Sequence, residues 1–382
     1  MDFTLTEEQS QIREMVRSLA RKEFAPGAAE VDESARFPEE NIRKLAELGL
    51  MGMLFPAEYG GSETGAVAYS LALSEIASGC ASTAVILAVS SMVGETIWRF
   101  GNEEQRNRYL PALASATDGI GAFALTEPEA GSDAQAISTT AVRDGDSFVL
   151  NGNKVFITNG DRAAVTIVMA VTGKGDRKEI SAFLVEGGAK GLTVGKPERK
   201  MGLKGSATVS LALEDCRVPD KAMLGSPGEG FRIAMSALDG GRIGIAAQAV
   251  GIARAALDSA AAYAKERKQF GQPISEFQAI QFMLADSATE VDASWLLICR
   301  AAYRKERGQP FGREASMAKV FATEAGNRAC HKAVQILGGY GYIRDYPLER
   351  HLRDIKVATI YEGTSEIQRI VVARDLLGRH GA

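Results

Sequence analysis

A glutamate followed by glycine near the end of the chain has the setting of an acid–base residue. Glu362 lies in the segment Ile360-Tyr361-Glu362-Gly363-Thr364-Ser365-Glu366-Ile367-Gln368. Ser365 and Gln368 have the spacing of a capping box, which predicts a helix that begins at about Ser365 and leaves Glu362 on the preceding loop. Free amides at this helix start could hold an anionic group, and Gly363 would let a substrate approach the backbone. A solvated loop glutamate is the simpler alternative.

Four other segments join the end of a strand or helix to residues that suit contact with a ligand. Each also has a simpler explanation: a capped turn, a turn that ends a strand, a helix capped by basic residues and glycine, or a tight helix exit. The glycine-rich run at residues 335–341 ends a helix and opens no βαβ unit, so it is not a dinucleotide-binding fingerprint. The four segments are residues 123–133, 154–160, 266–271 and 335–341.

Composition places the chain among ordinary globular proteins and removes several classes of function. Of its 382 residues, 46% are hydrophobic, and 44 basic against 48 acidic side chains give a net charge of −4. This balance gives no electrostatic reason to expect binding to nucleic acid or to an anionic membrane. The four cysteines form no C-x-x-C pair and the three histidines no H-E-x-x-H motif, so we expect no metal site and no disulfide framework. Neither a G-x-S-x-G elbow nor a P-loop is present.

The elements that must position these segments follow the order helices, strands, helices. Residues 1–116 carry helix signals, including the capping boxes that begin at Thr6 and Asn102. Residues 117–226 break into short β-type runs separated by the turn dipeptides Asp144-Gly145 and Asn151-Gly152. Residues 227–382 return to long, alanine-rich amphipathic helices. We therefore expect an α+β chain of three domains with these limits: an N-terminal helical domain, a middle β-barrel or sandwich, and a C-terminal domain like a four-helix bundle.

One uncharged stretch, between Glu75 and Glu95, is about as long as a membrane span. Its serines, threonine and glycines make it small and polar, so we predict a buried helical segment of the core and no membrane helix. The N-terminus has neither the basic region nor the apolar region of a secretory signal. We expect a cytoplasmic location, or the mitochondrial matrix for a processed form.

These segments, in this order and on this layout, resemble the acyl-CoA dehydrogenase family, and most of all its short-chain, butyryl-type bacterial members. The resemblance covers essentially the whole chain. Two motifs carry most of it: Leu125-Thr126-Glu127-Pro128-Glu129-Ala130-Gly131-Ser132-Asp133 and Tyr361-Glu362-Gly363-Thr364-Ser365-Glu366-Ile367-Gln368-Arg369. The runs Asp239-Gly240-Gly241-Arg242-Ile243-Gly244 and Gln335-Ile336-Leu337-Gly338-Gly339-Tyr340-Gly341 add to it.

The resemblance implies an FAD-dependent enzyme of fatty acid β-oxidation. Its members convert an acyl-CoA thioester, here of short to medium chain, into the trans-2-enoyl-CoA and pass the electrons to an electron-transfer flavoprotein. It also implies a homotetramer, built as a dimer of dimers.

The resemblance assigns roles to individual positions. Glu362 matches the catalytic base, and exclusion of water by the acyl chain should raise its pKa toward neutrality. Asp239, Arg242 and Gly363 match substrate-side positions, although Asp239 and Arg242 could instead form a helix salt bridge. Ser132 matches a contact to both the thioester and the flavin. The positions implied to bind FAD, partly across a subunit interface, are Phe123, Leu125, Thr126, Ser132, Phe156, Thr158, Arg267, Gln278, Gln335, Gly338, Gly339, Thr364 and Glu366.

Two departures and two alternatives accompany these roles. Many relatives carry tryptophan where Phe156 stands, and some place the base at the position of Gly241, which is glycine here. A flavin-dependent oxidase or monooxygenase on the same fold is one alternative, although monooxygenase relatives generally lack the glutamate at Glu362. A non-catalytic DNA-binding relative is the other, and it would need a basic surface that the net charge of −4 does not favour.

Overall fold

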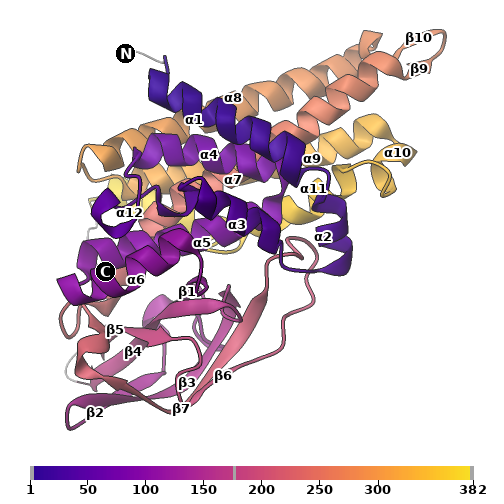
Figure 1. Ribbon diagram of the computed structural model, residues 1–382. Helices are drawn as coiled ribbons and strands as arrows, with labels where there is room; N and C mark the ends of the chain where they lie inside the picture. Colours follow the sequence, from indigo (N-terminus) through magenta and orange to yellow (C-terminus); the bar gives the residue numbers. More distant parts are fainter. Residues whose placement is uncertain (1–3, 175–177, 379–382) are drawn as a thin grey trace.

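The computed structural model describes residues 4–174 and 178–378, and it has the predicted order of helices, strands and helices. Helices from both ends of the chain pack together into one body, and the β-sheet lies against one side of that body (Figure 1). The α–β–α prediction is therefore confirmed. Long helices from the N-terminal and C-terminal regions share one hydrophobic core.

The described part of the N-terminal region, from residue 4 on, contains six α-helices, two of which are capped as predicted. Thr6 and Asn102 each accept a hydrogen bond from the backbone of the third helical residue, whose glutamine side chain bonds back to the cap. The helices are α1 (Glu7–Leu19), α2 (Ala28–Ser34), α3 (Glu39–Glu47), α4 (Gly65–Gly79), α5 (Ala81–Phe100) and α6 (Glu103–Ser115).

The uncharged stretch forms most of α4 and α5, which meet at Cys80. Helix α5 is long and apolar enough to cross a membrane by length and composition, but 94% of its most apolar window is buried inside the protein. It packs on α4, on α7 and on strand β1. The prediction of a buried helical segment is confirmed.

The middle region is an eight-stranded sheet in the order β6-β7-β3-β2-β4-β5-β8, with β1 paired to β4 in parallel. Most of the other neighbouring strands are antiparallel, as the short connections between them require. The strands are β1 (Ile120–Ala124), β2 (Thr140–Asp144), β3 (Ser147–Thr158), β4 (Ala163–Lys174), β5 (Lys178–Glu186), β6 (Leu192–Val194), β7 (Thr208–Pro219) and β8 (Met223–Leu224).

The expected turn at Asn151-Gly152 is wrong, because strand β3 continues through it. The register between β3 and β7 shifts between Leu150 and Gly152, so the dipeptide forms a bulge instead of a turn. Gly152 has φ of +152°, and a Cβ there would overlap Thr139. Glycine is needed at this position for close backbone approach, and Asn-Gly alone does not distinguish a bulge from a turn.

The C-terminal region is a bundle of long helices whose alanines allow close packing. Helix α7 packs along α9, α4, α5 and α8, and residues such as Ala246, Ala249 and Ala253 on it are fully buried. The helices are α7 (Gly230–Glu266), α8 (Gln278–Glu306), α9 (Gly312–Leu337), α10 (Gly339–Tyr342), α11 (Leu348–Lys356) and α12 (Ser365–Leu376). A short hairpin of β9 (Lys268–Gln269) and β10 (Gln272–Pro273) joins α7 to α8.

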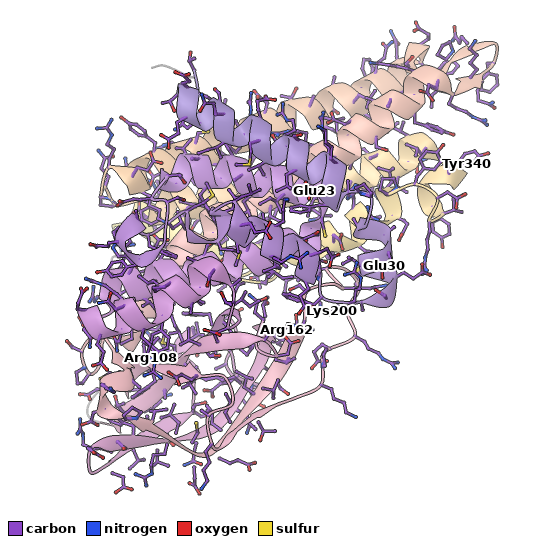
Figure 2. The ribbon with its side chains drawn as sticks, viewed as in Figure 1. Glu23, Glu30, Arg108, Arg162, Lys200 and Tyr340 are labelled. Atoms are coloured by element: carbon purple, nitrogen blue, oxygen red, sulfur yellow. The ribbon has the colours of Figure 1, made fainter. Side chains whose placement is uncertain are left out.

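Polar contacts join the sheet to the helical body. Arg162, just before β4, forms an ion pair with Glu39 of α3 at 3.3 Å and stacks over the ring of Phe37. Figure 2 shows Arg162 at the boundary between the sheet and the helices, with Lys200 nearby. These contacts join the start of the central strand β4 to helix α3 and the segment before it.

Candidate active site

Glu362 lies on a tight loop between the turn Val357–Thr359 and helix α12. Its backbone is left-handed, with φ of +51°, and that of Gly363 is also positive at +92°. The side-chain amide of Gln368, in the first turn of α12, donates to the carbonyl oxygens of Glu362 and Gly363 at 3.3 and 2.9 Å. The loop is therefore held by the helix that follows it, as the sequence predicted.

The cap of α12 differs from the prediction. The helix begins at Ser365 as expected, but the N-cap is Thr364, whose Oγ1 accepts a hydrogen bond from the Ile367 amide at 3.3 Å. The expected capping box of Ser365 with Gln368 is wrong, because Gln368 is used to hold the preceding loop. Glu366 is exposed in the first turn, where its negative charge interacts favourably with the helix dipole.

The carboxylate of Glu362 is placed where it could accept a proton. Within the part of the chain that the structure describes, its Oε2 atom is buried and has no hydrogen-bond partner. Burial raises the pKa of the Glu362 carboxyl to about 7, although the positive charges of Lys319 and Arg242 act in the opposite direction. This rise comes from burial by the protein itself, whereas the sequence analysis expected it from exclusion of water by the acyl chain.

Lys319, which the sequence analysis missed, lies behind this loop. Its side chain is fully buried, and Nζ donates to the carbonyl oxygens of Tyr361 and Gly363 at 2.7 and 2.5 Å. A signal was available: Lys319 follows Ala315 by four residues and precedes Ala322 by three, so it falls on the buried alanine stripe of α9. A charged residue on such a stripe needs polar partners.

Helix α7 forms the wall that faces Glu362. A Cβ on Gly241 would overlap the Glu362 carboxylate and would lie 3.1 Å from Sδ of Met92, so α7, α5 and the loop meet at this glycine. Arg242 is buried and binds Asp239 through a 2.6 Å ion pair. The structure therefore contains the helix salt bridge that the sequence analysis gave as the alternative. Arg242 directly follows Gly241, the residue that lies against the Glu362 carboxylate.

Tyr361 and Tyr69 add two buried hydroxyl groups that the sequence analysis also missed. Tyr361 donates to Gln248 Oε1 of α7 at 2.5 Å, and the Gln248 amide donates to the Ala81 carbonyl at 3.2 Å. Burial and the charge of Glu362 raise the pKa values of both tyrosines, so both remain neutral. These bonds tie the loop to α7 and α5.

The positions expected to contact the flavin on the sheet side lie close together. Phe123 is in β1, and Leu125 and Thr126 follow it directly. The Thr126 carbonyl accepts a hydrogen bond from the Val155 amide at 3.0 Å, which places this loop beside the end of β3. Phe156 lies there at a second bulge, with φ of +58° and a side chain that is 68% exposed.

A buried ion pair fixes this loop to β3. Nζ of Lys154 donates to Glu127 Oε1 at 2.8 Å and to the Leu125 carbonyl at 3.1 Å, and both charged side chains are almost completely buried. Glu127 also accepts hydrogen bonds from the amides of Ser138 and Thr139. Lys154 and Glu127 therefore position Leu125 and Thr126 relative to Phe156.

Helix α5 connects the sheet-side positions to the Glu362 loop. Its Ser90 accepts from the Gly121 amide at 3.1 Å, and its Ile86 carbonyl accepts from the Asn159 side chain at 3.2 Å. The same helix reaches Glu362 through Met92, opposite Gly241. Helix α5 thus contacts both the residues on the sheet side and the loop that carries Glu362.

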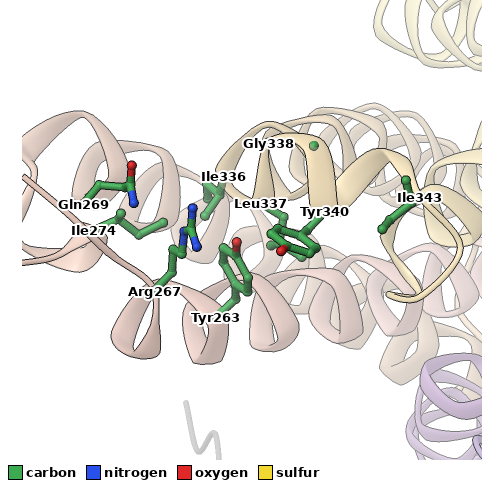
Figure 3. Close-up of a pocket in the computed structure, with 10 residues that line it drawn as sticks. Tyr263, Arg267, Gln269, Ile274, Ile336, Leu337, Gly338, Tyr340 and Ile343 are labelled. Carbon is green, nitrogen blue, oxygen red and sulfur yellow. The ribbon is translucent and has the colours of Figure 1, made fainter.

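The remaining positions implied to bind FAD lie at the other end of the helical bundle. Arg267, Gly338 and Gly339 line a cavity of about 440 Å³ between the ends of α7 and α9 (Figure 3). This cavity is at the end of the bundle where α10 lies, away from α12 (Figure 1). Gln335 and Gln278 are exposed near the same end of the bundle. Within one chain, the structure does not bring these residues to Glu362.

The residues at the end of β3 and in the loop after β1 fit a flat aromatic cofactor. The exposed ring of Phe156 offers a stacking surface, and Thr158 lies two residues further along the same strand. Ser132 is exposed, and a Cβ on the neighbouring Gly131 would meet no atom within 4 Å, so there is open space beside the loop. At the other end of the bundle, Gly338 and Gly339 have equally open space.

Sequence comparisons match nearly the whole chain to one family. The acyl-CoA dehydrogenase N-terminal domain matches residues 6–117, the acyl-CoA dehydrogenase middle domain residues 122–216, and the acyl-CoA dehydrogenase C-terminal domain residues 228–377. The short-chain specific acyl-CoA dehydrogenase of Clostridium acetobutylicum is 47% identical over 375 residues, which cover 98% of this chain and 99% of the relative.

Solved structures have the same fold along their whole length. Butyryl-CoA dehydrogenase from Megasphaera elsdenii superposes with a TM-score of 0.96 at 44% identity, covering 99% of this chain and 100% of the other. A chain from a structural study of the electron transferring flavoprotein of Acidaminococcus fermentans and its electron bifurcation superposes with a TM-score of 0.97 at 47% identity, with the same two coverages.

Proposed function

Because the chain belongs to the acyl-CoA dehydrogenase family, a family of FAD-dependent oxidoreductases, we propose that Glu362 is its catalytic base. The substrate would be a short- to medium-chain acyl-CoA, and the product the trans-2-enoyl-CoA. The buried Oε2 atom of Glu362, which has no hydrogen-bond partner among the described residues, is the observation that supports this role. A carboxylate in that state can take a proton without first breaking an interaction with the protein.

The protein's own contribution is a base with a suitable pKa at a fixed position. A carboxylate with an ordinary pKa of about 4.3 is a poor base for a carbon acid such as the α-carbon of a thioester. With a pKa of about 7, Glu362 is partly ionised at neutral pH and accepts the α-proton more readily. The chemistry that bound FAD would supply is acceptance of a hydride from the β-carbon.

The FAD would be held by the two groups of residues that the resemblance assigned to it. Phe123, Leu125, Thr126, Phe156 and Thr158 suit the isoalloxazine side, because the exposed Phe156 ring and the ordered loop lie together. Ser132, Thr364 and Glu366 would make further contacts near the reacting end.

The cavity between α7 and α9 supports the proposal that one subunit completes the FAD site of another. Arg267, Gly338 and Gly339 line this cavity, and Gln278 and Gln335 are exposed near it. All five lie away from the Glu362 loop of their own chain, so a second copy would bring them to a flavin. A homotetramer, as a dimer of dimers, is the assembly that we propose.

The side chains opposite Glu362 support the proposal that the substrate has a short acyl chain. Met92 of α5 and Tyr69 of α4 lie against Gly241 and Gly244 of α7, so bulky side chains fill the space beside the base. Asp239, Arg242 and Gly363 would line the substrate side. The two related dehydrogenases named above are short-chain and butyryl-CoA enzymes.

The remaining parts of the proposal concern partners, place and domain limits. The acceptor would be an electron-transfer flavoprotein, and the enzyme would act in β-oxidation in the cytoplasm. The likeness to a chain from a structural study of such a flavoprotein supports the acceptor. We place the domains at residues 1–116, 117–226 and 227–382, which is supported by the change from helix to strand after Ser115 and back to helix at Gly230.

The test is an anaerobic titration of the FAD-loaded enzyme with straight and branched acyl-CoAs of increasing chain length. Bleaching of the flavin absorbance by the short-chain thioesters is expected. Glu362→Gln should retain FAD and bleach at least 100-fold more slowly, because removal of a general base costs about 10²–10⁴-fold in rate. Glu8→Gln makes the same chemical change at an exposed position of α1 and should behave as wild type. A flavin that no thioester bleaches would contradict the proposal.

A further inference from the structure

Lys319 is a buried cation bound to the backbone on both sides of the proposed base. It lies in the middle of α9 and is fully buried. Its two acceptors, at 2.7 and 2.5 Å, are the carbonyl oxygens of Tyr361 and Gly363, which flank Glu362 in the chain. The contact is therefore made to the loop that carries the base, by a residue more than forty positions earlier.

The conformation of the loop explains why such a contact is needed. Glu362 and Gly363 both have positive φ, and a residue with a side chain adopts that conformation at a cost of about 1–2 kcal/mol. The Tyr361 and Gly363 carbonyl groups then point toward α9, where a buried acceptor without a donor would be destabilising. The ammonium of Lys319 donates to both, and the Gly363 carbonyl also accepts from the Gln368 amide.

Among the described residues, no aspartate or glutamate forms an ion pair with Lys319. In residues 4–174 and 178–378, no aspartate or glutamate oxygen lies within 4.0 Å of its Nζ. The negative charge that acts on it is that of Glu362, and burial lowers the pKa of Lys319 to about 8 against this attraction. A buried lysine is costly, and methionine of similar length would pack on an alanine stripe without that cost.

The other charges around the loop are already compensated. On α7, Arg242 is paired with Asp239 at 2.6 Å. On α5, Glu95 is paired with Lys305 of α8 at 2.6 Å. Tyr69 of α4 and Tyr361 remain neutral because burial raises their pKa values, and Glu366 of α12 is exposed to water. Among the described residues, Lys319 is therefore the cation that acts on Glu362 without being paired to another carboxylate.

We propose that Lys319 is a positioning residue for the base: it holds the peptide groups on both sides of Glu362, and its charge sets the pH at which that carboxylate accepts a proton. This inference rests on the proposed role of Glu362. Because the charge of each group acts on the pKa of the other, a change at Lys319 moves the apparent pKa of Glu362. Loss of the cation removes an attraction that favours the carboxylate, so that pKa must rise.

The experiment measures proton transfer separately from the redox step. The FAD-loaded enzyme is incubated in D₂O with methylthioacetyl-CoA, whose β position is sulfur, so no hydride can leave. Glu362 takes a proton from the α-carbon, a deuteron from the solvent replaces it, and nothing is oxidised. Nuclear magnetic resonance of the thioester gives the exchange rate between pH 5 and 10 for the wild type and for Lys319→Met, Lys319→Gln and Lys319→Arg.

The wild-type rate should rise with pH around a midpoint near 7, the pKa of the base. In Lys319→Met and Lys319→Gln the midpoint should move up by about one pH unit, because a unit charge a few ångströms away shifts a buried pKa by at least that amount. At pH 7 the exchange should be about five-fold slower than in the wild type. Lys319→Arg, which keeps the charge, should keep the midpoint within a few tenths of a unit.

Controls separate the possible failures. Lys200→Met removes a partly buried lysine that donates to the Ser206 carbonyl and has no effect on the pKa of Glu362, so its midpoint should stay at the wild-type value. Thermal unfolding identifies any variant that does not fold, and the glutamine and arginine variants then carry the test. An unchanged midpoint in a folded, neutral Lys319 variant overturns the inference, whereas a wild type without any exchange overturns the role of Glu362.

Discussion

Gly241 and Glu362 lie so close together that no side chain fits between them. A Cβ on Gly241 would overlap Oε2 and approach Cδ of Glu362 at 3.0 Å, from the middle of helix α7. Glycine costs about 1 kcal/mol relative to alanine inside a helix. The missing methyl group at Gly241 therefore leaves room for the base at the expense of helix stability.

Gly241→Ala should separate activity from stability. The atom that it meets is the end of a flexible side chain, so the fold can adjust by moving the carboxylate, and helix propensity improves. We expect a midpoint of thermal unfolding no lower than that of the wild type, and a 10- to 100-fold slower bleaching of the flavin by butyryl-CoA, because a displacement of about 1 Å can cost about 10²-fold. Rapid-mixing absorbance and calorimetry measure the two quantities.

Gly251→Ala, on the same helix, is the matched control. Its Cβ would overlap the Ser74 carbonyl, which is backbone and cannot move away. This variant should lose stability while its folded fraction reacts at the wild-type rate. Equal activity of Gly241→Ala and the wild type would contradict the close placement of the base.

The raised pKa of Glu362 predicts how activity depends on pH. The group must be deprotonated to act as a base, and its pKa is about 7, so kcat/KM should fall about ten-fold for each pH unit below 7 and level off above it. The measurement is the initial rate with butyryl-CoA and an artificial electron acceptor between pH 5 and 9. A plateau that extends down to pH 5 would show a base with an ordinary pKa.

The buried pair of Glu127 and Lys154 predicts a loss of stability when one partner is removed. Glu127→Gln leaves the Lys154 ammonium buried without a counter-charge, which should lower the free energy of unfolding by about 3–5 kcal/mol. The double variant Glu127→Leu, Lys154→Met should recover much of that loss, because neither charge then remains buried. Urea unfolding of the apoprotein measures both losses. If the loss in the double variant equalled the sum of the losses in the two single variants, the pairing would be contradicted.

The same pair predicts sensitivity to acid. Burial alone would raise the pKa of Glu127, but hydrogen bonds from Lys154, Thr139 and Ser138 lower it to about 2. A carboxyl group with a folded-state pKa below its unfolded value stabilises the fold above about pH 4, and this stabilisation is lost as the pH falls toward 2. In Glu127→Gln the decrease in stability between pH 5 and 2 should be smaller than in the wild type, as measured by urea unfolding at each pH.

The backbone conformation of Phe156 predicts that alanine and glycine at this position differ in their effect on stability. Its φ of +58° is strained for any residue with a Cβ, and its ring is 68% exposed. Phe156→Ala and Phe156→Gly should both weaken FAD binding, because both lose the stacking surface, by about ten-fold or more. Phe156→Gly should be more stable than Phe156→Ala by up to about 1 kcal/mol in the apoprotein, since glycine accepts positive φ. Flavin fluorescence titration and thermal unfolding test the two parts.

Local signals in the sequence predicted the elements well where they depend on neighbouring residues. The capping boxes at Thr6 and Asn102 are present, and α12 begins at Ser365, where the sequence predicts it. The exceptions are instructive. Asn151-Gly152 forms a bulge and not a turn, because β7 and Thr139 lie against it. Gln368 does not cap α12, because Thr364 is the N-cap and Ile367 is then the third helical residue, while the Gln368 amide donates to the preceding loop.

The sequence by itself determined the order of helices and strands, the family, and the motif that contains Glu362. These follow from residue types and spacings within short segments, where propensity, periodicity and turn chemistry act. The tertiary structure decided what surrounds that glutamate: Gly241 and Met92 from two helices, and the buried Lys319 from a third. A pKa depends on burial and on charges a few ångströms away. Those charges come from residues far apart in the chain, so only the packing of the helices could bring them together.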